Sequence, residues 1–138
     1  MKTVVVDTDA LIALISKDDA LAPKAVKILQ GLYEREVKLV YPATTIVEAT
    51  TTIQRELSDP SLAGEIAQMI RDSRLDIVAI DQGILELAET LFAPTGSKQN
   101  TMFDAVVAAI AQILEADAVF SFDKWYEKIG LTLASGLV

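Results

Sequence analysis

The sequence predicts an α/β fold with a mostly parallel central sheet and helices on both of its faces. Two patterns support this prediction: short apolar runs typical of buried strands recur along the 138 residues, and segments with helical periodicity separate them. The chain also lacks any repeat, low-complexity tract or linker. We therefore expect one domain over residues 1–138, which is long enough to bury a hydrophobic core.

Each expected strand is a short apolar segment, and each expected helix repeats its apolar residues at intervals of three and four. The strands are expected at 3–6, 38–41, 76–80, 118–120 and, with a weaker pattern, 131–134. The helices are expected at 10–16, 23–35, 45–57, 61–73, 83–92, 102–115 and 124–128.

Composition excludes several kinds of chemistry. The chain has no cysteine and no histidine, so it cannot form a disulfide, a Cys/His zinc site, a thiol nucleophile, a Ser-His-Asp triad or a histidine acid–base pair. Carboxylates, hydroxyls and lysines remain, and oxygen ligands suit Mg²⁺ or Mn²⁺. The formal net charge of -8 disfavours broad, nonspecific nucleic-acid binding but suits a basic partner.

The sequence shows neither a membrane anchor nor a secretion signal. No apolar run approaches the roughly 20 residues that a membrane helix needs. The first residues lack the basic region, apolar stretch and small-residue cleavage site of a signal peptide. We therefore expect a cytoplasmic protein that does not associate with membranes.

Five acidic residues interrupt or border apolar segments. Asp7 and Asp9 follow the first expected strand, and Asp123 follows the fourth. Ligands of parallel α/β folds gather beyond the carboxyl ends of the strands. Asp104 stands in an otherwise apolar helix, where an unpaired carboxylate would be strongly unfavourable. Together with Glu48, these residues predict a cluster of oxygen ligands for a divalent metal ion.

Four of these acids also have a structural interpretation as helix caps. Asp7 or Asp9 would cap the helix that begins near residue 10. Asp104 would stabilise the first turn of its own helix, where the helix dipole favours an acid. Asp123 would cap the helix at 124–128. A single helix N-terminus needs only one capping acid, and here two acids are present. We therefore favour a metal-binding role for Asp7.

Glu48 has its own structural alternative. The segment from Thr45 to Glu48 fits a capping box, in which Glu48 would accept a hydrogen bond from the Thr45 amide. Capping and metal ligation are compatible if the helix begins at Thr44 instead. The surrounding helix is rich in threonine, which is a mediocre helix former and offers hydroxyls to a polar pocket.

The order of these segments resembles the PIN domain, and in particular the VapC-type toxins of prokaryotic toxin–antitoxin pairs. The resemblance covers the whole chain. Its segments are Val-Val-Asp-Thr-Asp-Ala-Leu-Ile at 5–12, Glu48 in the threonine-rich helix, Asp-Ala-Val-Val-Ala-Ala-Ile-Ala at 104–111, and Phe-Ser-Phe-Asp-Lys at 120–124. It implies a three-layer α/β/α sandwich and a metal-dependent ribonuclease.

The resemblance also implies site residues, a cofactor and partners. The catalytic and metal-binding quartet would be Asp7, Glu48, Asp104 and Asp123, with Ser121 at a position that is frequently Ser or Thr in the family and Asp9 as an additional ligand. VapC-type proteins usually form homodimers and are neutralised by a small antitoxin that inserts a basic side chain into the acidic cleft. We expect Mg²⁺ or Mn²⁺ as the cofactor.

The expected reaction is hydrolysis of an RNA phosphodiester by a metal-activated water, leaving a 5′-phosphate and a 3′-hydroxyl. Single-stranded or looped RNA is the expected substrate, because its backbone is more accessible to a shallow cleft than a duplex groove. Two alternatives stay open. Asp7 and Asp9 also resemble the start of a haloacid-dehalogenase-type phosphatase, although Leu11 stands where that family expects Thr and Asp123 has no adjacent acid. The other alternative is a non-catalytic PIN-like interaction domain.

Three further expectations concern surfaces. The apolar stripes of helices 23–35 and 45–57 are expected to be mostly core, although they could leave a groove for an antitoxin. Trp125 and Tyr126 are expected to pack the last helix rather than to stack on bases. Lys98 lies in a loop before the Asp104 helix, and we expect it to be solvated, although it could also steer a phosphate.

Overall fold

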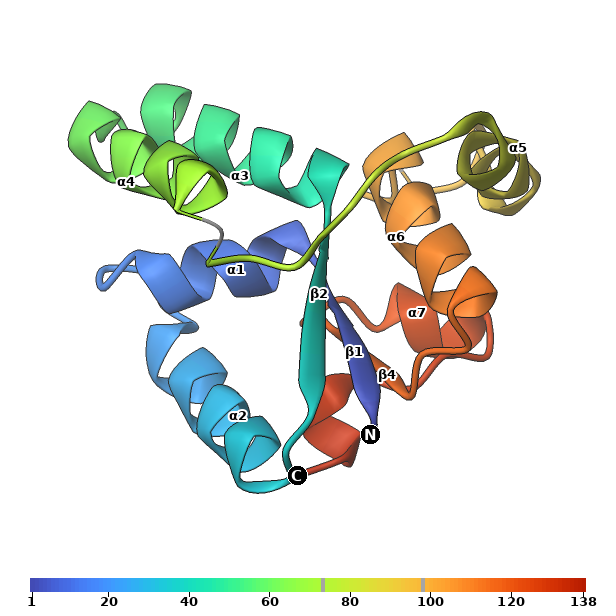
Figure 1. The fold of residues 1–138 in the computed structure, drawn as a ribbon. Coiled ribbons are helices and arrows are strands. Elements are labelled where there is room, and N and C mark those ends of the chain that lie inside the picture. Colours follow the sequence, from blue (N-terminus) through green and yellow to red (C-terminus); the bar gives the residue numbers. More distant parts are fainter. Residues whose placement is uncertain (73, 98) are drawn as a thin grey trace.

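The computed structural model describes residues 1–72, 74–97 and 99–138, and its centre is a parallel sheet (Figure 1). The strands are β1 (Thr3–Val6), β2 (Lys38–Pro42), β3 (Ile77–Val78) and β4 (Ala118–Phe120), and their order is β3-β2-β1-β4. Every pair of neighbouring strands is parallel. In the register of the central strands, Val5 lies between Val40 and Val119. The predicted α/β class with a parallel sheet is confirmed.

Helices cover both faces of the sheet (Figure 1). Within the described ranges they are α1 (Thr8–Ile15), α2 (Ala22–Glu34), α3 (Ala43–Arg55), α4 (Pro60–Arg71), α5 (Gln82–Leu91), α6 (Met102–Ile113) and α7 (Trp125–Lys128). The alternation of side chains along β1 separates the two cores. Val4 and Val6 pack with residues of α1, α2, α3 and α4, whereas Val5 packs with α5, α6 and α7. The expected three-layer α/β/α sandwich is therefore present.

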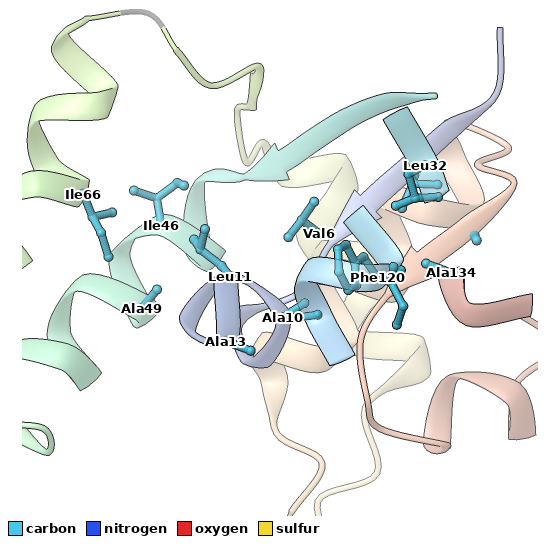
Figure 2. Packing of buried hydrophobic residues seen from close by; sticks show 14 of the residues in the cluster. Val6, Ala10, Leu11, Ala13, Leu32, Ile46, Ala49, Ile66, Phe120 and Ala134 are labelled. Carbon is cyan, nitrogen blue, oxygen red and sulfur yellow. The ribbon is translucent and has the colours of Figure 1, made fainter. Parts of the chain in front are cut away.

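The core explains why β1 consists of three valines after Thr3. Its three valines are all fully buried because helices cover both sides of the strand. Figure 2 shows part of the core on the α1 side, including Val6, Ala10 and Phe120. Ala10 and Ala13 of α1 are buried in the same core.

The apolar stripes on α2 and α3 belong mostly to this core, as the sequence analysis favoured. Ile28 and Leu32 of α2 are buried, and so are Ile46 and Ile53 of α3. Not every apolar residue is covered. Over the ranges 23–35 and 45–57, the large apolar residues that stay exposed are Val26, Tyr33, Val47 and Leu57.

Two expected strands differ from the prediction. The segment 76–80 forms only the two-residue β3, which lies at the sheet edge and pairs with β2 alone. The segment 131–134 makes a single bridge between Leu133 and Val119, and a 3₁₀ turn (Ala134–Gly136) follows it. Edge segments have a neighbour on one side only, so the apolar pattern alone overestimated how far they pair. The helix expected at 61–73 ends at Arg71, and Ser73 lies outside the described residues.

Among the residues described, none of the helices is both long enough and apolar enough to cross a membrane.

Candidate metal centre

Parallel pairing of β1 with β4 creates the centre of the candidate site. Asp7 and Ser121 each follow directly on one of these strands. The pairing of Val6 with Phe120 sets them side by side, and the Asp7 amide donates a hydrogen bond to the Phe120 carbonyl at 3.0 Å. The Ser121 hydroxyl consequently lies 2.9 Å from Asp7 Oδ2, although 114 positions separate the two residues in the chain.

A pocket of about 270 Å³ lies beyond these strand ends. All five acids singled out in the sequence line it, and they come from the start of α1, from α3, from α6 and from the segment after β4. Its lining residues are Asp7, Thr8, Asp9, Ile12, Glu48, Thr52, Gln99, Asp104 and Asp123. The fold therefore brings the predicted quartet and Asp9 to one pocket, which we call the acidic pocket. Ser121 lies behind it, hydrogen-bonded to Asp7.

Asp7 is the most enclosed member of the acidic pocket, with 4% of its surface exposed. Its Oδ1 accepts a hydrogen bond from the Thr8 amide at 2.8 Å. Its Oδ2 accepts from the Ser121 hydroxyl and from the Tyr126 hydroxyl, both at 2.9 Å. Burial, followed by the charges of Asp9 and Asp104, raises the pKa of Asp7 from 3.8 to about 8. Asp7 therefore holds a proton at neutral pH unless a cation is present.

Asp9 shares the Ser121 hydroxyl with Asp7. Its Oδ2 lies 3.2 Å from Ser121 Oγ and also accepts from the Phe122 amide at 2.9 Å. Its Oδ1 accepts from the Ala10 amide at 2.6 Å. Burial raises the pKa of Asp9, although these hydrogen bonds oppose the shift. One hydroxyl proton cannot serve two carboxylates at once, so the arrangement favours an additional proton or a cation between Asp7 and Asp9.

Glu48 does not form the predicted capping box. The helix α3 begins at Ala43, so neither Thr44 nor Thr45 is its N-cap, and Thr45 Oγ1 instead donates to the Val6 carbonyl at 3.1 Å. Glu48 lies one turn further along and accepts a hydrogen bond from the Thr8 hydroxyl. Burial raises its pKa. The sequence pattern failed here because β2 runs directly into α3, which leaves no room for a separate cap.

Asp104 and Asp123 do contribute to helix starts, as their structural interpretations predicted. Asp104 Oδ2 accepts from the Thr101 amide at 3.0 Å, at the N-cap of α6. Asp123 Oδ1 accepts from the Trp125 amide at 2.9 Å, and its Oδ2 accepts from the Asn100 side chain at 2.8 Å. Burial, then the charges of Asp123 and Glu48, raises the pKa of Asp104 to about 6. Capping and a place in the acidic pocket therefore coexist.

The donor set fits a hard divalent cation by its chemistry. It consists of carboxylates and hydroxyls, and the charges of the carboxylates raise one another's pKa values, an effect that a cation would relieve. In the part of the chain that is described, no three acidic side chains are already arranged as ligands of one ion. Their oxygens accept protein hydrogen bonds instead. An ion would compete with some of these donors.

Sequence reasoning missed several residues of the site, most notably Tyr126. Its ring packs the last helix as expected and is fully buried, but its hydroxyl also binds Asp7. A buried tyrosine needs a hydrogen-bond partner, and this general rule was the available signal. Gln99 and Asn100 were missed as well, because no motif distinguished them. The threonine-rich helix, by contrast, was expected to offer hydroxyls to a polar pocket, and its Thr52 does line the acidic pocket. Lys98 lies outside the described residues.

The substitution Tyr126→Phe tests how far Asp7 depends on this hydroxyl. The variant keeps the ring but removes a donor that favours the ionised form of Asp7, so the pKa of Asp7 should rise further. We expect the free energy of unfolding to fall by about 1 kcal/mol. We also expect Mn²⁺ to bind several-fold more weakly at pH 7 in calorimetry, since the ion must displace a more tightly held proton. The exposed Tyr33 provides the control, because Tyr33→Phe should change neither quantity.

The fold and the pocket define an α/β protein whose acidic binding edge lies at the carboxyl ends of parallel strands. The family model of the PIN domain matches residues 4–130. The chain belongs to the PIN domain family. No curated protein matches it in sequence.

Solved structures share this fold at low sequence identity. VapC20 of Mycobacterium tuberculosis, described as a toxin that cleaves the sarcin–ricin loop, is 17% identical with a TM-score of 0.77, covering 94% of this chain and 96% of that one. FitAcB from Neisseria gonorrhoeae is 17% identical with a TM-score of 0.67, covering 94% and 95%. VapBC2 from Rickettsia felis, bound to a DNA fragment from its promoter, is 15% identical with a TM-score of 0.65, covering 95% and 96%.

Proposed function

We propose that this protein is a metal-dependent endoribonuclease that cleaves single-stranded or looped RNA, and that it is the toxin of a toxin–antitoxin pair. The observation that carries the proposal is the convergence of five carboxyl groups, from four segments of the chain, on one pocket beyond the ends of β1 and β4. Membership of the PIN domain family supports nuclease activity. The likeness in fold to VapC20 and VapBC2 supports the toxin assignment.

In this proposal Asp7, Glu48, Asp104 and Asp123 hold Mg²⁺ or Mn²⁺, with Asp9 and Ser121 as additional ligands. The bound ion would activate water for attack on the phosphodiester and neutralise charge that develops on the phosphate.

The protein's own hydrogen bonds orient these groups. Ser121 and Tyr126 fix Oδ2 of Asp7, and Thr8 fixes the Glu48 carboxylate. The Asn100 side chain fixes Asp123. Glu48 reaches the pocket from α3, and there it either ligates the ion or orients the attacking water.

The dimensions and charge of the acidic pocket favour an exposed RNA backbone. A pocket of about 270 Å³ admits a phosphodiester group and its immediate surroundings rather than a duplex. Five nearby carboxyls would repel RNA without a cation, so substrate binding and metal binding should be linked. A small antitoxin that inserts a basic side chain would compete with the metal for the same carboxylates. We further propose that the protein acts in the cytoplasm as a homodimer built from one PIN-like domain per chain.

The decisive experiment measures cleavage of a loop-containing RNA with Mg²⁺, with Mn²⁺ and with EDTA. We expect cleavage with either ion and at least a 100-fold loss with EDTA, which corresponds to roughly 3 kcal/mol of transition-state stabilisation. The products should carry 5′-phosphate and 3′-hydroxyl ends. Equal cleavage in EDTA would refute the metal-dependent mechanism.

Two controls address the alternatives from the sequence. The family match removes the main support for the phosphatase, and an aryl phosphate should accordingly not be hydrolysed. Calorimetric titration with Mn²⁺, read together with the cleavage assay, distinguishes a catalytic metal site from one that binds the ion without catalysis. Metal binding without cleavage of any RNA tested would instead support a non-catalytic interaction domain.

A further inference from the structure

A groove of about 560 Å³ follows α2, outside the acidic pocket. Three cations line it, Lys24, Lys27 and Arg35, against one acidic side chain, Glu34. Residues near the end of the chain, Ser135 and Val138, form its other wall. These three cations are a quarter of the 12 lysines and arginines in a chain with a net charge of -8. The feature, which we call the α2 groove, is therefore a local concentration of positive charge on an acidic protein.

The geometry of α2 arranges the three cations in a line. At 100° per residue, positions 24, 27 and 35 fall on one face of the helix. Eleven residues of helical rise separate the first from the last, which gives a span of about 16 Å. Arg35 is fixed at the far end, because its Nη1 donates to the Gly31 carbonyl at 2.9 Å. The groove thus offers a row of charges rather than a single cationic point.

Among the described residues, the three cations of the α2 groove form no ion pair with an acidic side chain. Across residues 1–72, 74–97 and 99–138, the ion pairs join Lys38 to Asp76 and Arg74 to Asp72. None involves a cation of the groove. All three side chains belong to exposed residues. They are therefore available to an anionic ligand.

Lys24, in the first turn of α2, is linked to the acidic pocket through one residue, Phe122. Lys24 Nζ lies 5.6 Å from the centre of the Phe122 ring, a cation–π contact. The amide of Phe122 donates to Asp9, which lines the acidic pocket. Figure 1 shows α2 running from its start near α1 toward the opposite end of the sheet, where the C-terminus lies. The Lys24 end of the groove is thus the end nearer to the acidic pocket, and the Arg35 end lies further from it.

We propose that the α2 groove binds the sugar–phosphate backbone of the RNA on one side of the cleavage site. This inference rests on the proposed function and adds to it the surface that holds the substrate. A row of cations is suited to a linear polyanion, and such contacts are independent of sequence. The groove also explains how a protein with a net charge of -8 retains an RNA that its acidic pocket would repel. An acidic protein segment is the competing occupant, but the link from Lys24 through Phe122 to Asp9 favours RNA.

The test measures binding separately from cleavage. A labelled single-stranded RNA of roughly 12 nucleotides, long enough to fill both sites, is titrated by fluorescence anisotropy at several salt concentrations. The protein carries Asp104→Asn and the buffer contains EDTA, so that no cleavage interferes. We expect Lys24→Gln/Lys27→Gln/Arg35→Gln to weaken binding at least 10-fold at low salt. The plot of log affinity against log salt should become shallower, its negative slope shrinking in magnitude by about 2, since each lost phosphate contact removes about 0.7.

A charge-matched variant controls for the overall field of the protein. Lys2→Gln/Arg55→Gln/Arg71→Gln removes three exposed cations outside the α2 groove and gives the same net charge. This variant should bind RNA nearly as tightly as the parent. Equal affinity in the two triple variants would overturn the proposal, and so would the absence of RNA binding by the parent.

Two further readouts separate this proposal from the proposed nuclease. In the otherwise unmutated protein, the groove variant should raise the KM for the long RNA and leave cleavage of a minimal oligonucleotide, confined to the acidic pocket, unchanged. If the parent binds RNA through the α2 groove but cleaves none, the groove proposal stands and the nuclease fails. A polyglutamate peptide tests the competing occupant. If the groove variant binds this peptide more weakly than the parent but binds RNA equally well, the groove binds acidic protein segments and the RNA proposal is wrong.

Discussion

Asp104→Asn is expected to reduce metal-dependent RNA cleavage by at least 100-fold while the protein stays folded. Asparagine retains an oxygen that can accept the hydrogen bond from the Thr101 amide, so the start of α6 keeps its cap. The amide removes the negative charge and one ligand oxygen from the acidic pocket. A loss of this size corresponds to roughly 3 kcal/mol of transition-state stabilisation. Single-turnover cleavage of a loop RNA with saturating Mn²⁺ measures it.

The matched control for this prediction is Asp81→Asn. Asp81 likewise caps a helix, accepting from the Ile84 amide at the start of α5, but it does not line the acidic pocket. Its variant should cleave at the parental rate. Thermal unfolding of both variants shows whether the caps survive. Undiminished cleavage by Asp104→Asn would remove Asp104 from the catalytic machinery and with it the main support for the proposed reaction.

Asp7→Asn is expected to stabilise the metal-free protein, although Asp7 is a proposed ligand. The pKa of Asp7 is about 8 in the folded protein and 3.8 when the carboxyl is freely exposed. Below pH 3.8 both states hold the proton and burial of Asp7 has no electrostatic cost. Between pH 3.8 and about 8 the unfolded chain releases the proton that the folded protein keeps, so the free energy of unfolding falls as pH rises. At pH 7 this cost is roughly 4 kcal/mol.

Asparagine has no charge to desolvate, so it avoids this cost. Part of the gain is lost, because the amide must donate where Oδ2 accepted and the Tyr126 hydroxyl then loses its acceptor. We expect a net gain of roughly 2 kcal/mol at pH 7, or about 5 °C in Tm. The fall in stability between pH 4 and 8 should also become shallower. Denaturant titrations in EDTA at several pH values measure both effects.

With Mn²⁺ present, the parent should become more stable than Asp7→Asn. The parent gains stability in proportion to the logarithm of the metal concentration once the ion binds, whereas Asp7→Asn should gain much less. Asp117→Asn serves as the control, because Asp117 is exposed and accepts a backbone hydrogen bond from Thr3. It should follow the parent in both buffers. A metal-free Asp7→Asn protein that is less stable than the parent would show that Asp7 acts mainly as a structural hydrogen-bond acceptor.

These two predictions describe a site that reduces folding stability. Burial and mutual repulsion raise the pKa values of Asp7, Asp9, Glu48 and Asp104. Hydrogen bonds from the protein reduce the cost for several of them but do not remove it. Sites that depart from the most stable arrangement are typical of functional rather than structural clusters. The acidic pocket therefore differs in kind from the isolated caps Asp59 and Asp81, which each stabilise one helix.

Much of the fold was predictable because its signals are local. The three consecutive valines of β1 and the apolar residues of α6 indicate burial through composition and periodicity alone. The edge segments were predicted less well: β3 is shorter than its apolar run, and 131–134 forms only a bridge. Pairing at an edge depends on one neighbouring strand, and no local pattern encodes where that neighbour ends.

The sequence by itself determined the layered α/β class, the absence of histidine and cysteine chemistry, and the identity of the acids that interrupt apolar segments. Only the tertiary structure decided that Ser121 lies between Asp7 and Asp9, that Tyr126 donates to Asp7, and that Glu48 pairs with Thr8 rather than with Thr45. The reason is physical. A hydrogen bond depends on ångström-scale placement of side chains from segments that here lie between 40 and 119 positions apart, and strand register and helix packing set that placement.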